Sequence, residues 1–211
     1  MWPFKMIYAC MPLRAARHRC FFTHTKARPT KFGKLKRFME TVVADNIRCM
    51  KQGVNLLEIV TDDLYHNLSS ARSGTGIGPH IRHTLDHYLS FLSGYKNGRI
   101  DYDARERDPR IENDPLHAKR QFERVISAFN DLAGDLNQPL WVKTDSGSHV
   151  EETNWSQSTL KRELQFLVSH TIHHYAIIAI LLRARGFEPG EEFGVAPSTI
   201  EYRRSRLACA Q

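Results

Sequence analysis

The chain has 211 residues and a formal net charge of +7 at pH 7, but its positive charge is concentrated at one end. Residues 1–39 contain ten lysines and arginines and no acidic residue, so residues 40–211 carry a net charge of −3. This charge argues against a nucleic-acid-binding domain, while 41% hydrophobic and 25% charged residues are typical of a globular chain. The longest uninterrupted apolar run, 176–182, is far shorter than the roughly 20 residues of a membrane span. We expect neither a nucleic-acid nor a membrane partner.

Residues 1–38 form a basic leader with three open interpretations. The leader is rich in arginine and lacks acids, as organellar transit peptides do, and it has no compact apolar core of a secretory signal. Alternatively the true start lies at Met39, or the leader is a solvated basic tail. We expect little order before about residue 38 and one domain over residues 39–211.

The cysteines favour a reducing compartment, because they form neither a C-x-x-C pair nor a disulfide framework. No neighbouring pattern marks one of them as a catalytic nucleophile. The four positions are Cys10, Cys20, Cys49 and Cys209. We expect a cytoplasmic protein, or one of an organellar matrix if the leader is a transit peptide.

Apolar residues spaced three and four positions apart predict four long helices. In chain order they span about Glu40–Leu68, Pro79–Gly94, Leu116–Leu132 and Ser156–Arg185. The fourth begins with Ser156 or Ser158 as its N-cap and ends at Gly186. Four helices of this length predict an all-α, up-and-down four-helix bundle, for which a homodimer is plausible.

The segments between the helices have simpler patterns. A Gly- and Ser-rich connector covers 69–79, and 138–146 can hold a short strand. Residues 96–115 are polar and densely charged, and we expect a long surface loop there. Its part 102–108 either covers a cleft or is a solvated loop held by ion pairs, and we favour the second. The tail 187–211 can end in a short helix.

Histidine is the unusual residue of this chain, with eleven in total. His80, His83 and His87 lie on one stripe of the second helix, because a helix turns about 100° per residue. On the fourth helix His170 and His174 are four residues apart, a spacing that lets two imidazoles reach one metal ion. A lone histidine is more often a hydrogen-bonded core residue. Histidines on two helices that face each other, among otherwise apolar residues, favour a metal site. Imidazole is a suitable ligand for zinc, nickel, copper or iron.

These segments resemble the DinB/YfiT-like metal-binding four-helix proteins. His80-Ile81-Arg82-His83-Thr84 is similar to the W-H-L-x-H-T run in the DinB-like domain of ergothioneine-forming sulfoxide synthases, and residues 170–174 look like the H-x-x-H-H signature of the last helix. The resemblance covers about residues 40–186, and 193–199 also looks like a motif of some members. It implies that His83, His170 and His174 are the three metal ligands. His87 competes with His83 on geometry, and the resemblance alone ranks His83 first.

The chain departs from the family where Tyr175-Ala176-Ile177 replaces the common Arg-Gly-Gln. It is also too short to contain the second catalytic domain of the sulfoxide synthases. Family members include thiol-dependent S-transferases and isomerases. The resemblance therefore implies a metal-dependent enzyme, a thiol-linked transferase acting on a small molecule with a low-molecular-weight thiol as partner. The alternative is a non-catalytic metal-binding or stress-response bundle.

Two carboxylates are candidates for a catalytic role or for orienting a ligand imidazole. Glu163 precedes His170 by two helical turns, and Asp86 follows His83 by three residues. For Glu163 we favour the simpler interpretation of a solvated carboxylate in the first turn of its helix. His173 is expected next to the ligands or packed against another helix. The expected cofactor is one divalent ion, namely zinc, nickel or iron.

Overall fold

The computed structural model describes residues 31–67, 76–144 and 155–208, with side chains from Met39 onward. The predictions for residues 1–30 lie outside these ranges. So does most of the connector at 69–79.

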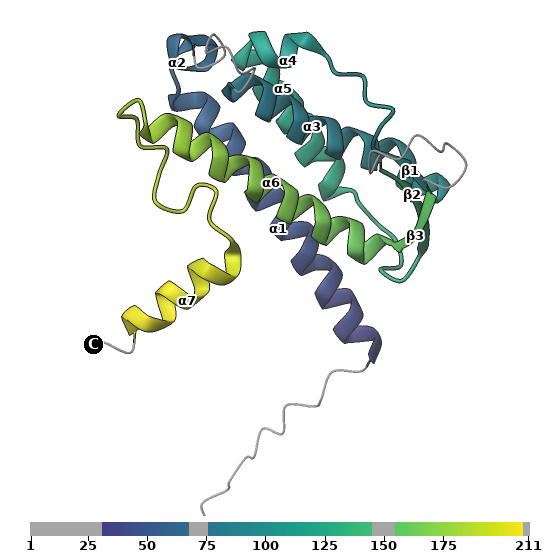
Figure 1. Ribbon diagram of the computed structural model, residues 1–211. Helices are drawn as coiled ribbons and strands as arrows, with labels where there is room; N and C mark the ends of the chain where they lie inside the picture. Colours follow the sequence, from purple (N-terminus) through teal and green to yellow (C-terminus); the bar gives the residue numbers. More distant parts are fainter. Residues whose placement is uncertain (1–30, 68–75, 145–154, 209–211) are drawn as a thin grey trace, which may run out of the picture.

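Four long helices form the bundle (Figure 1). They are α1 (Lys31–Ile59), α3 (Ile77–Gly94), α5 (Pro115–Asn130) and α6 (Leu160–Arg183). Helix α1 packs against α5 and α6, and α3 packs against the same two helices. These four contacts close the ring of a four-helix bundle, as the sequence predicts.

The first predicted helix is wrong at both ends. Helix α1 begins at Lys31, inside the basic leader, and ends at Ile59, and a separate short helix, α2, spans Asp62–Asn67. The hydroxyl of Thr61 accepts a hydrogen bond from the Leu64 amide at 3.3 Å and so caps α2. Tyr65 of α2 is fully buried, so the apolar spacing of the sequence continues past the end of α1. The hydroxyl of Tyr65 donates a hydrogen bond to the Ile111 carbonyl.

The segment 96–115, expected to be a surface loop, contains regular structure. A 3₁₀ turn, η1 (Tyr95–Asn97), leads into strand β1 (Arg99–Asp101), and helix α4 (Pro109–Asn113) follows. Strand β1 pairs in parallel with β2 (Pro139–Lys143), and β2 pairs antiparallel with β3 (Trp155–Thr159). The strand expected at 138–146 is therefore confirmed as β2, while β1 and β3 were not expected.

Strand β3 also shifts the start of α6. The N-cap is Thr159, whose hydroxyl accepts from the Arg162 amide, so neither Ser156 nor Ser158 caps the helix. The predicted end is close, because Gly186 adopts φ 75°, the left-handed backbone of a residue just beyond a helix. The short final helix of the tail is α7 (Pro197–Ala208), and none of its residues is buried.

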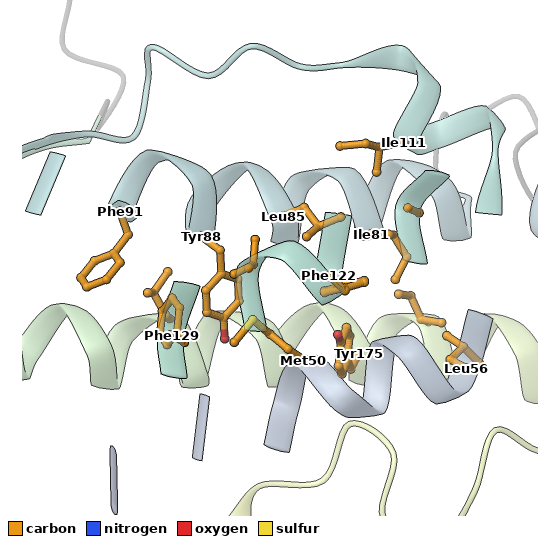
Figure 2. Packing of buried hydrophobic residues seen from close by; sticks show 14 of the residues in the cluster. Met50, Leu56, Ile81, Leu85, Tyr88, Phe91, Ile111, Phe122, Phe129 and Tyr175 are labelled. Atoms are coloured by element: carbon orange, nitrogen blue, oxygen red, sulfur yellow. The ribbon is translucent and has the colours of Figure 1, made fainter. Parts of the chain in front are cut away.

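The core lies between the four long helices and is rich in aromatic rings (Figure 2). A buried polar network crosses it: Asn46 on α1 donates to the Leu164 carbonyl on α6 and accepts from the Tyr88 hydroxyl on α3. Thr171 on α6 donates to the Tyr88 hydroxyl at 3.2 Å. Because Tyr88 and Thr171 directly follow His87 and His170 in the chain, this network fixes the two histidine-bearing helices against each other.

Gly53 lets α1 approach α5 and α6 closely. A side-chain carbon at this position would lie 2.8 Å from the ring of Phe122 and would collide with the Tyr175 hydroxyl. The glycine costs helix propensity but provides the space that the two aromatic rings occupy. Figure 2 shows these two rings between the helices.

Helix α6 is the one candidate membrane span among the described helices, by its length and composition. In the bundle it packs against α1 and α3 and supplies fully buried Leu164, Leu167 and Leu182. Its apolar residues thus have a place in the core of the bundle.

Candidate metal centre

Three histidine rings meet where α3 faces α6. His83 comes from α3, and His170 and His174 come from successive turns of α6. Nε2 of His170 lies 3.2 Å from Nε2 of His83 and 3.1 Å from Nε2 of His174. Imidazole nitrogens bound to one tetrahedral ion at about 2.0–2.1 Å would be about 3.3 Å apart. Two of the three Nε2 pairs are close to this spacing, and the ligand atoms of all three histidines lie within 4.8 Å of one another, so the chain has a histidine triad able to hold a metal.

The three imidazoles of the triad are in the charge state that metal ligation requires. Burial lowers the pKa of His83 to about 3, that of His170 to about 2 and that of His174 to about 4, and the neighbouring histidines add to each shift. All three imidazoles are therefore neutral at neutral pH. Since a metal ligand must offer a lone pair, these side chains need not lose a proton to bind an ion.

His80 lies behind His174 and orients it. Nδ1 of His80 is 2.9 Å from Nδ1 of His174, so one of the two nitrogens donates and the other accepts. When Nε2 of His174 binds a metal, its Nδ1 carries the proton and His80 accepts. Nε2 of His80 is buried and has no hydrogen-bond partner among the described residues. His80 is thus a positioning residue for His174.

His87, the competitor of His83, lies beside the triad. Its Nδ1 hydrogen-bonds to the His83 carbonyl at 2.9 Å, and its ring lies 4.0 Å from the ring of His170 and stacks on Tyr102. Burial lowers the pKa of His87 as well. Among the described residues the converging nitrogen from α3 belongs to His83, and His87 forms part of the wall.

Glu163 is completely buried, so the expectation of a solvated carboxylate is wrong. It accepts hydrogen bonds from Tyr102 at 2.9 Å, from Ser158 at 2.5 Å and from Arg162 at 2.9 Å. These bonds tie α6 to β3 and to the segment after β1. Through Tyr102, which stacks on His87, the carboxylate also supports the wall of the site.

Asp86 forms an ion pair with Arg82 and is not among the residues whose ligand atoms converge in the triad. Its carboxylate is buried and bonds to Arg82 at 2.9 Å, and Arg82 also bonds to Glu112. Burial raises the pKa of Asp86, while Arg82 and then Arg105 lower it. A catalytic role for Asp86 or Glu163 remains a prediction, since both carboxylates have structural partners.

His173 is exposed on α6 with its ring 5.1 Å from that of His174, so of its two expected positions it takes the one next to a ligand. In contrast, the segment 102–108 covers the site, although we favoured a solvated loop. Tyr102 is fully buried, and Arg105 donates from Nη1 to Nδ1 of His83 at 2.7 Å. Phe166 completes the wall, 5.4 Å from the rings of both Tyr102 and His170.

Sequence reasoning assigned no role to Tyr102, Arg105 or Phe166. A charged stretch such as 102–108 does not show which of its members turns inward. The available signal was the single aromatic residue at its start, because a tyrosine among charges marks a point that can be buried.

Two comparisons with known proteins gave matches. The family model described as "DinB family" matches residues 37–196. FK506-binding protein 5 of Rhizopus delemar is 30% identical over 104 residues, which are 49% of this chain and 27% of that protein. The chain thus matches about a quarter of the length of this curated relative, and no solved structure matches it. Because the family match covers most of the chain, the protein belongs to the DinB family.

Proposed function

We propose that this protein binds one divalent metal ion through His83, His170 and His174 and uses it as a thiol-linked transferase acting on a small molecule. The observation that carries the proposal is the convergence of three neutral Nε2 atoms at 3.1 and 3.2 Å between α3 and α6. Three imidazoles suit zinc, nickel or iron, so the donor set fits the expected ion. Three protein ligands also leave a coordination position open, as catalytic sites do.

The ion would supply a lowered pKa for a coordinated thiol, making it a nucleophile at neutral pH. In a thiol transfer the thiol loses its proton, its sulfur forms a bond to carbon, and the leaving group departs with its electron pair. The side chains of the protein hold the reactants. Tyr102, Phe166 and His87 form an aromatic wall beside His170 and shield the site from water.

The second candidate function is non-catalytic metal binding. The buried carboxylates favour this alternative, because Glu163 and Asp86 are engaged in hydrogen bonds and ion pairs and neither is free to act as a base. The two functions differ in whether a small thiol reaches the ion. We propose a cytoplasmic protein in either case.

Metal analysis of the purified protein tests metal binding, which both candidate functions require. We expect one zinc, nickel or iron per chain, and loss of the metal in a variant with His83, His170 and His174 replaced by alanine. His173→Ala is the matched control, because His173 is exposed on the same helix. Full metal content in the triple variant would contradict the proposal.

Addition of small thiols to the cobalt-substituted protein separates the two functions. A thiolate bound to cobalt gives a charge-transfer band in the near ultraviolet, so the transferase proposal expects this band on titration. A cobalt spectrum that no thiol changes would favour non-catalytic metal binding.

A further inference from the structure

Arg105 and the metal compete for the same imidazole. Nη1 of Arg105 lies 2.7 Å from Nδ1 of His83. A guanidinium can only donate hydrogen bonds, so Nδ1 accepts and neutral His83 carries its proton on Nε2. Nε2 is the atom that faces His170, 3.2 Å from its Nε2. The contact with Arg105 thus holds the His83 tautomer that cannot bind an ion.

Metal binding must end this contact. Once the Nε2 lone pair binds an ion, the proton of a neutral imidazole lies on Nδ1, and two donors face each other at the Arg105 contact. The charge of the ion adds repulsion, because the guanidinium lies only one imidazole ring away. Ligation by His83 and the Arg105 hydrogen bond therefore exclude each other.

The released guanidinium needs another acceptor. Burial already disfavours its charge and lowers the pKa of Arg105, and its Nε atom is buried without a hydrogen-bond partner. Two carboxylates act on Arg105: Asp86, which is bonded to Arg82 at 2.9 Å, and Asp103 on the same segment, which has an interaction of its own. Leaving a charged donor half-buried and unsatisfied is costly, so a group from outside the protein gains by pairing with it.

The charge of the loaded site selects that group. The three imidazoles are neutral, so they leave both positive charges of the ion uncompensated. Arg105 adds another positive charge beside the ion. A ligand whose thiol reaches the ion and whose carboxylate reaches Arg105 supplies negative charge at both points. Arginine and carboxylate also match in geometry, since each can form two parallel hydrogen bonds.

We infer that Arg105 alternates between two partners: His83 in the metal-free protein and an anionic group of the substrate in the metal-loaded protein. The inference rests on the proposed function, because it assumes that a thiol reaches the ion. It names the substrate class as thiols that carry a carboxylate. In the metal-free protein the same residue opposes loading.

Cobalt titration of the metal-free protein tests the first partner. We expect Arg105→Ala to bind cobalt about tenfold more tightly than the wild type, because it removes the one hydrogen bond that competes with ligation by His83. Arg107→Ala removes the same charge from the same segment, and because Arg107 is exposed we expect less than about a threefold change. Equal cobalt affinities of Arg105→Ala and Arg107→Ala would overturn the inference.

Two matched thiols test the second partner, with absorbance of the cobalt-loaded protein as the readout. We expect 3-mercaptopropionate to bind the wild type and Arg107→Ala about tenfold more tightly than 3-mercapto-1-propanol, and Arg105→Ala to bind both equally. Equal binding of the two thiols by the wild type would mean that the released guanidinium finds its acceptor within the protein, and would overturn the inference alone. Binding of neither thiol would instead overturn the proposed transferase.

Discussion

Replacing His80 by leucine separates metal affinity from fold stability. Nδ1 of His80 lies 2.9 Å from Nδ1 of His174, so in the metal-loaded protein His80 accepts the Nδ1 proton and keeps Nε2 of His174 aimed at the ion. A half-buried hydrogen bond contributes about 1–1.5 kcal/mol, so its loss should weaken metal binding about tenfold. The usual effect of residues that orient metal ligands is about 10- to 100-fold, which agrees with this value.

The same substitution should leave the metal-free fold intact. Leucine removes the buried, unpartnered Nε2 of His80 while filling a similar volume, but it also removes the hydrogen bond to His174. Because the two effects oppose each other, we expect the free energy of unfolding of the metal-free protein to change by less than about 1 kcal/mol.

Competition titration with a chromophoric chelator measures the affinity, and urea unfolding measures the stability. His173→Ala is the control, because it removes an exposed imidazole from α6 and should change neither quantity. Unchanged metal affinity in His80→Leu would refute the idea that His80 orients His174. A large loss of stability would refute the tautomer assigned to His80.

Three further predictions concern the fold around the site. Gly53→Ala should lower the free energy of unfolding by about 1–3 kcal/mol in urea, because its methyl group would collide with Tyr175 and Phe122; an unchanged midpoint would contradict this packing. Cys49 should resist iodoacetamide at pH 8 in the folded protein and react in urea, since burial raises the pKa of its thiol to about 11, and peptide mass mapping after digestion shows whether it does. Hydrogen bonds from Arg110 lower the pKa of Asp108 to about 2, so its stabilising effect is complete above about pH 4 and is lost as the pH falls toward 2. Asp108→Asn should therefore cost about 0.5 kcal/mol at pH 7 and nothing near pH 2, and a cost independent of pH would exclude this carboxylate as the source.

Much of the bundle follows from local patterns in the sequence. The four long helices have strong apolar periodicity, and an i, i+4 spacing already places His170 and His174 on one face of α6. The placement of His83 opposite them depends on the packing of α3 against α6, which no local pattern contains. The family resemblance favoured His83 over His87 as the ligand from α3. The structure gives a physical reason, because the ring of His87 is stacked on Tyr102.

The surroundings of the triad could not be predicted in the same way. Strand β1 has three residues, and so short a segment has no measurable alternation. The sequence predicts an exposed Glu163, because carboxylates in the first turn of a helix are usually exposed. Its hydrogen bond from Ser158 depends on the pairing of β2 with β3, which the sequence does not predict. Arg105 lies among other charges, and its contact with His83 depends on how the segment after β1 folds back over α3.

Anomalous diffraction at the zinc edge from crystals of the zinc-loaded protein shows directly whether His83, His170 and His174 bind one metal ion. We predict a single peak between α3 and α6, about 2.0–2.1 Å from Nε2 of each of the three histidines. A peak ligated by His87 in place of His83, or no peak between these helices, would contradict the account.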